Sequence, residues 1–91
     1  MRQGGEVPEL SRFLGIVIAM YYRDHAPSHF HAYYGNYDIT VVIDSGQVNG
    51  EFPHRALAHV QEWRQAHVVE LREDWELATL RKPLQRIAPL E

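Results

Sequence analysis

Three histidines lie within seven residues of this chain, and they are the residues best suited to chemistry. They are His25, His29 and His31, and only three other histidines occur among the 91 residues. Imidazole is the side chain whose ordinary pKa lies near neutrality, and its neutral form is a common metal ligand. The cluster therefore predicts a site that binds a metal ion or moves protons, unless the rings serve the fold alone.

A divalent transition metal is one interpretation of the cluster. His29 and His31 are two residues apart, so they share a face if this segment is a strand, and His25 enters from the preceding loop. Neutral imidazoles favour Zn or Ni over Mg or Ca. Asp24 or Asp38 would then supply a carboxylate, or accept a hydrogen bond from a liganding ring and fix its tautomer. Without a thiolate, we expect such a site to be weak.

Two other interpretations stay open. In the first, His29, His31, Tyr33 and Asp38 are catalytic and transfer protons during RNA cleavage or hydrolysis. The chain has no glycine-rich phosphate loop or basic groove to support that activity. In the second, the histidines are structural, because buried or half-buried imidazoles normally find hydrogen-bond partners. The sequence leaves open whether the protein is an enzyme.

Composition predicts one small domain. Hydrophobic residues make up 45% of the 91 residues, which is enough for a compact core. The chain has no cysteine, which fits a reducing compartment. The longest apolar run is about half of what a membrane span needs, and the N-terminus lacks the apolar core of a signal peptide. We therefore expect a cytoplasmic protein with a flexible leader over residues 1–7 and a single α+β domain over residues 8–91.

Charge argues against a nucleic-acid partner. Residues 1–53 contain three arginines and six carboxylates, whereas residues 54–91 contain six basic and six acidic residues. The half that carries the histidine cluster is therefore the acidic half. Nucleic-acid affinity depends largely on Lys and Arg that neutralise phosphates, so this half favours a cation instead.

A hairpin turn fixes which side chains accompany the histidines. Gly35 and Asn36 lie between two strand-like runs, a composition typical of a two-residue turn. In that register His31 faces Thr40, and Phe30 belongs to the opposite, apolar face. The hairpin therefore makes His29 and His31 neighbours on the face away from the core.

The remaining elements complete an α+β fold. Residues 11–22 read as one buried strand, and residues 47–52 as a short, weak edge strand. Residues 53–80 carry a helical apolar stripe, which we break near residues 66–68 because one helix would be about 40 Å long. The tail is expected to pack, extended, over the core. We predict a three- to four-stranded antiparallel sheet followed by two helices packed on one face.

The chain resembles a known family in several strings. They are Asp24-His-Ala-Pro-Ser-His-Phe-His31 with Tyr34-Gly35, the segment Pro53-His-Arg-Ala-Leu57, and the two tryptophans Trp63 and Trp75. These strings resemble the small prokaryotic family catalogued as domain of unknown function 4160. Ser28 departs from it, because the family often has a second proline there.

The resemblance implies a partner rather than a reaction. The family has no established activity and no assigned catalytic residues, and its members are often encoded beside another small protein, as in toxin–antitoxin systems. We therefore expect a module that binds a small protein encoded nearby. The alternative is a metal-binding or RNA-cleaving protein that uses His25, His29 and His31. The sequence indicates no oligomeric state.

Overall fold

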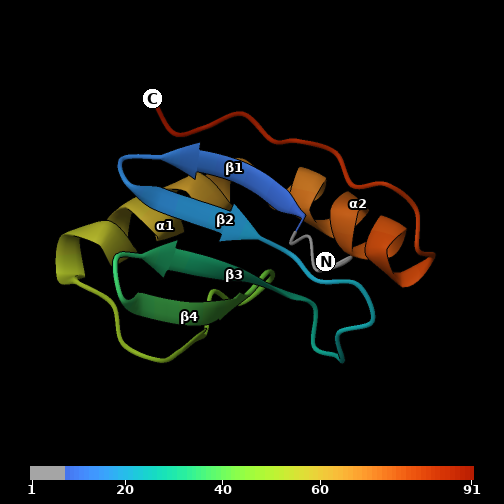
Figure 1. The fold of residues 1–91 in the computed structure, drawn as a ribbon, viewed down its shortest axis with the longest axis horizontal. Coiled ribbons are helices and arrows are strands. Elements are labelled where there is room, and N and C mark those ends of the chain that lie inside the picture. Colours follow the sequence, from blue (N-terminus) through green and yellow to red (C-terminus); the bar gives the residue numbers. More distant parts are fainter. Residues whose placement is uncertain (1–7) are drawn as a thin grey trace, which may run out of the picture.

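A five-stranded antiparallel sheet followed by two helices makes up the protein, in a computed structural model that describes residues 8–91 (Figure 1). The predicted leader, residues 1–7, lies outside the described residues. Neighbours in sequence are neighbours in the sheet, in the order β1-β2-β3-β4-β5. The strands are β1 (Glu9–Phe13), β2 (Ile16–Ala19), β3 (His29–Tyr34), β4 (Tyr37–Val42) and β5 (Val48–Asn49).

The sheet has more strands than the three or four predicted. Residues 11–22 do not form one strand, because a tight turn at Leu14 and Gly15 separates β1 from β2. Both turn residues have positive φ, 51° and 79°, which is the backbone of the hairpin turns that match strand twist. Leucine is an unusual residue at positive φ, so the apolar run concealed the turn. Residues 47–52 contain only the two-residue strand β5.

The predicted register of the β3–β4 hairpin is confirmed. His31 pairs with Thr40, Phe30 with Val41, and Tyr34 with Tyr37 across the turn. Phe30 is fully buried, whereas His31 is half-buried on the opposite face. Alternation along β3 thus separates the core face from the histidine face.

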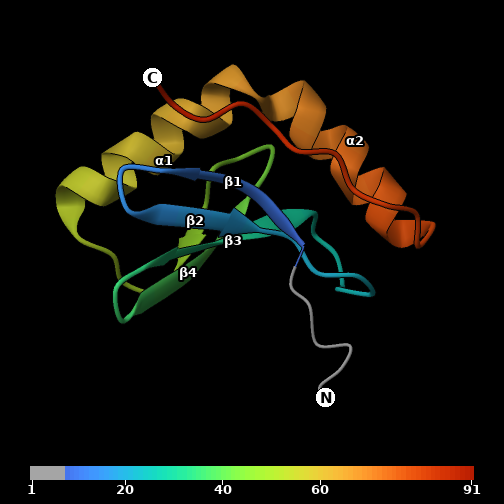
Figure 2. The same cartoon turned by 45° about the horizontal axis from the view of Figure 1, so that its top comes forward.

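Two helices cover one face of the sheet, as predicted (Figure 2). Helix α1 (His54–Ala66) follows directly after Pro53, and α2 (Val68–Thr79) begins after a break at His67. His67 has φ −130° and ψ 28°, outside helical values, and this residue redirects the chain. Because the chain changes direction at His67, both helices lie over the same face of the sheet.

The core lies between the sheet and the helices, with the fully buried Trp63 of α1 at its centre. The tail after α2 is extended, as expected, and packs against this core. Its Ile87 N–H donates to Leu10 O at 2.8 Å, and the Trp63 indole N–H donates to Ala88 O at 2.8 Å. The tail thereby covers the outer edge of β1. Neither helix within residues 8–91 is long and apolar enough to cross a membrane.

Candidate functional site

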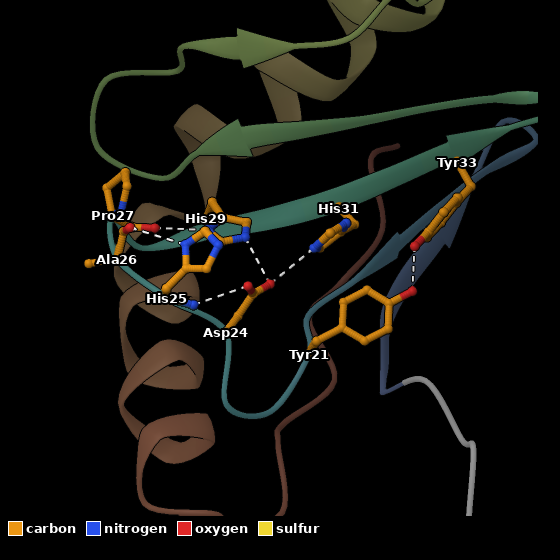
Figure 3. A network of polar contacts seen from close by, with 8 residues as sticks. All are labelled: Tyr21, Asp24, His25, Ala26, Pro27, His29, His31 and Tyr33. Carbon is orange, nitrogen blue, oxygen red and sulfur yellow. Dashed lines mark hydrogen bonds and ion pairs between the residues drawn. The ribbon is translucent and has the colours of Figure 1, made fainter.

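Strand β3 places two of the three clustered histidines side by side (Figure 3). His29 and His31 occupy alternate positions of the strand, and their ring centroids are 5.3 Å apart. His29 is buried because Trp75 of α2 packs on it, with a centroid separation of 5.3 Å. His31 is half-buried, and its ring is nearly perpendicular to that of Tyr21, with the ring centroids 4.5 Å apart.

Asp24 joins the two imidazoles. Its Oδ2 lies 2.9 Å from Nε2 of His29 and 3.3 Å from Nε2 of His31. Its Oδ1 accepts the backbone N–H of His25 at 3.0 Å. One ligand atom from each of Asp24, His29 and His31 lies within 4.8 Å of the others, which is the spacing at which a single metal ion could contact all three.

The other predicted site residues lie outside this group of three. The His25 ring is exposed, and its Nδ1 lies 3.3 Å from Ala26 O. Asp38 is exposed on β4, opposite Tyr33 in the hairpin register. The structure therefore brings Asp24 into contact with His29 and His31, and it places His25 and Asp38 further out.

The hydrogen bond made by Nδ1 of His29 determines what Nε2 of the same ring can bind. Nδ1 of His29 lies 2.7 Å from Pro27 O, and a carbonyl oxygen only accepts, so Nδ1 carries a proton. In the neutral ring Nε2 then has a lone pair, and this lone pair faces the Asp24 carboxylate oxygen at 2.9 Å. Two acceptors at this distance need a cation between them, which is either a proton shared by the two groups or a metal ion. A backbone carbonyl on the far ring nitrogen is also the usual support of a metal-bound histidine.

Asp24 is ionised at neutral pH. Burial raises the pKa of Asp24, but this effect is outweighed by the hydrogen bonds from His31 and from the His25 backbone and by the charge of His29. The pKa of Asp24 therefore lies below its ordinary value of 3.8. A negative carboxylate between two imidazoles attracts a cation.

Two tyrosines extend the site along the sheet. The hydroxyl groups of Tyr21 and Tyr33 share a hydrogen bond, as Figure 3 shows. Burial and this hydrogen bond raise the pKa of Tyr33 above its ordinary value of 10. The Tyr33 phenol is therefore protonated at neutral pH and bonds to Tyr21, while its ring lies parallel to that of His31 at 6.4 Å.

A small hollow opens next to the Asp24 carboxylate. It has a volume of about 130 Å³ and lies between the segment after β2 and helix α2. Sequence reasoning did not assign Trp75 or Tyr21 to the site, because their contacts join elements far apart in the chain. The only sequence signal for Asp24 was its place in the same string as the histidines. The residues that line the hollow are Tyr21, Arg23, Asp24, Trp75, Ala78 and Thr79.

Comparison with known proteins identifies a family but no activity. No curated protein and no solved structure matches the chain. Residues 15–76 match a family model, and this segment contains Asp24, His29 and His31 together with most of both helices. Because the match spans more than half of the chain, the protein belongs to the family described as Domain of unknown function (DUF4160).

Proposed function

We propose that the protein binds one divalent transition metal ion through Nε2 of His29, Nε2 of His31 and the carboxylate of Asp24. The contact that carries this proposal is the close approach of His29 Nε2 to Asp24 Oδ2, with the opposite ring nitrogen held by Pro27 O. Two imidazoles and one carboxylate favour Zn, Ni, Co or Fe over Mg or Ca.

Such a ligand set resembles catalytic rather than structural zinc sites in its ligand count. Structural sites use four protein ligands, whereas catalytic sites use three and leave a position for water or substrate. Here three ligand atoms converge, and one of the three residues, Asp24, also lines a small hollow. A bound metal would act as a Lewis acid and lower the pKa of its water. Trp75 and Tyr21 would shield this position from bulk solvent.

Calorimetric titration with Zn²⁺ and with Ni²⁺ at pH 7.5 tests the proposal. Wild type should bind one ion, and His31→Gln should lose at least about 100-fold in affinity, because removal of even a supporting hydrogen-bond partner commonly weakens a metal site by 10–100-fold. His25→Gln is the matched control, since its exposed ring lies outside the group of three. It should bind like wild type.

The outcomes separate the candidate ligand sets. Equal loss in His25→Gln and His31→Gln would instead support the three clustered histidines as ligands. Wild-type affinity in His31→Gln would refute both sets. Binding should also fade at pH 5.5, because imidazole must give up its proton to bind a metal and ordinarily titrates near pH 6.5.

Binding of a small cytoplasmic protein is a second candidate function, and an exposed patch favours it. The patch, here called the hairpin-end patch, consists of Leu14, Tyr34 and Tyr37, which are 60%, 37% and 49% exposed. Leu14 lies in the turn between β1 and β2, and Tyr34 and Tyr37 flank the turn between β3 and β4. The two turns lie close together, because a Cβ on Gly15 would lie 3.1 Å from the Tyr34 ring. Large apolar and aromatic side chains gathered on a surface are typical of protein interfaces.

The partner that the family resemblance implies is the product of the neighbouring gene. We expect it to co-elute with the wild-type protein in size-exclusion chromatography, and expect the double variant Leu14→Ser, Tyr37→Ser to elute alone. Leu80→Ser is the matched control, because Leu80 is also exposed, at 56%, but lies at the end of α2. Co-elution of the double variant would exclude the hairpin-end patch as the interface.

A further inference from the structure

The hollow beside Asp24 is also lined by an arginine, Arg23. Arg23 lines the hollow and takes part in none of the ion pairs within residues 8–91. Its φ is 64°, in the left-handed region that residues other than glycine rarely adopt. Such backbone conformations gather at functional sites, where the surrounding structure holds them. Arg23 is exposed and lines the hollow together with the candidate metal ligand Asp24.

The hollow is small and partly open to solvent. Its volume is about 130 Å³, which is enough for a carboxylate or phosphate group. Its other lining residues are Tyr21 and the α2 residues Trp75, Ala78 and Thr79. The Thr79 hydroxyl already donates to Trp75 O, and Arg23 is the only cationic side chain among the residues that line the hollow.

We propose, on the basis of the metal site proposed above, that the hollow binds a small oxyanion between the metal ion and the Arg23 guanidinium. The ligand class is a carboxylate or a phosphate ester of the size of one such group. Arginine binds both oxyanions through two parallel N–H donors, and the metal takes an oxygen at its open position.

Charge makes this binding depend on the metal. In the metal-free protein the Asp24 carboxylate lines the same hollow as Arg23 and opposes the entry of an anion. A divalent ion added to Asp24 and Arg23 gives the hollow a net charge of about +2, which attracts one. The two binding events are linked. An anion that binds only the metal-loaded protein must raise the affinity for the metal by the same factor by which the metal raises the affinity for the anion.

Titration with Co²⁺ at pH 7.5, read from its visible absorption band, tests the inference with three anions. Methyl phosphate and acetate are the two oxyanion probes, and chloride at equal ionic strength is the reference. At 10 mM, at least one oxyanion should shift the Co²⁺ band and tighten Co²⁺ binding about 5–150-fold, the usual range for coupled sites. The oxyanion with the larger effect identifies the preferred ligand.

Two variants locate the effect. Arg23→Gln should bind Co²⁺ in chloride like wild type and lose the oxyanion effect. Arg55→Gln is the matched control, because Arg55 lines a different hollow at the start of α1, and it should retain the effect. An unchanged oxyanion effect in Arg23→Gln, or no effect in Co²⁺-loaded wild type, overturns the inference while the metal site stands. Wild type that binds no Co²⁺ in any anion overturns the metal site, and the inference falls with it.

Discussion

Replacing Asp24 by Asn is the most direct perturbation of the cluster, and its effect on stability can be worked out from the contacts. The carboxylate accepts the His25 backbone N–H and contacts the imidazoles of His29 and His31. Asparagine has the same shape, still accepts from His25, and can donate its amide N–H to Nε2 of a neutral His29. The variant therefore keeps the contacts and removes the charge.

The expected cost follows from the two imidazole contacts. A hydrogen bond to a charged group contributes about 1.5–3 kcal/mol and a neutral one about 0.5–1.5 kcal/mol, so each contact weakens by about 1 kcal/mol. The Asp24 side chain is 21% exposed, which screens part of this difference. We expect a loss of about 1–2 kcal/mol in the free energy of unfolding at pH 6. Each kcal/mol corresponds to about 4–8 °C in Tm for a domain of this size.

The pH dependence has a definite sign. Because the pKa of Asp24 is lowered in the folded protein, its stabilising effect is complete above the ordinary value of 3.8 and is lost as pH falls through the folded value. The gap between wild type and Asp24→Asn should therefore close as pH falls below 3.8. Urea unfolding with a metal chelator present, at pH 6 and pH 3, measures both quantities. Equal stability of the two proteins at pH 6 would refute the carboxylate–imidazole contacts.

Three further predictions concern groups outside the ligand set. Burial raises the pKa of Asp74 in the folded protein. As pH rises from 3.8, the free energy of unfolding of wild type should therefore fall relative to that of Asp74→Asn. Urea unfolding of both proteins measures this, and parallel plots of unfolding free energy against pH would contradict it. Trp63→Ala empties the centre of the core and should cost about 3–5 kcal/mol in urea unfolding, and a loss below 1 kcal/mol would show that the helices do not pack there. In a spectrophotometric titration of the tyrosines, Tyr33 should ionise above pH 10, and Tyr33→Phe should remove this late step and no earlier one.

Strand alternation made much of the fold and part of the site predictable. The turn at Gly35 and Asn36 fixes the register, and the register alone places His29 and His31 on one face and Phe30 on the other. The turn between β1 and β2 was not predictable in the same way, because Leu14 does not signal a positive φ. Sequence rules thus worked where side-chain chemistry favours the observed backbone, and failed where tertiary packing imposes it.

The contact between Asp24 and the histidines depends on the conformation of the loop after β2, for which no periodic rule exists. Asp24 was recognised as a candidate partner of the histidines, but its position between two rings follows from the path of residues 20–28. The Trp75 contact depends on the break between α1 and α2, which directs α2 over the start of β3. The chemistry was therefore visible in the sequence, and the geometry required the tertiary structure.

A proton and a metal ion are competing occupants of the position between His29 and Asp24. In a structural cluster the proton is the only occupant, so Asp24→Asn lowers stability and added Zn²⁺ leaves wild type unchanged. In a metal site, Zn²⁺ at 100 times its Kd adds about 2.7 kcal/mol to wild type, and His31→Gln loses this gain. The stability of Asp24→Asn therefore tests the geometry, whereas the response of wild type to Zn²⁺ tests the function. Since both occupants use the same lone pair of His29, only the two measurements together separate a stabilising ion pair from a metal-binding site.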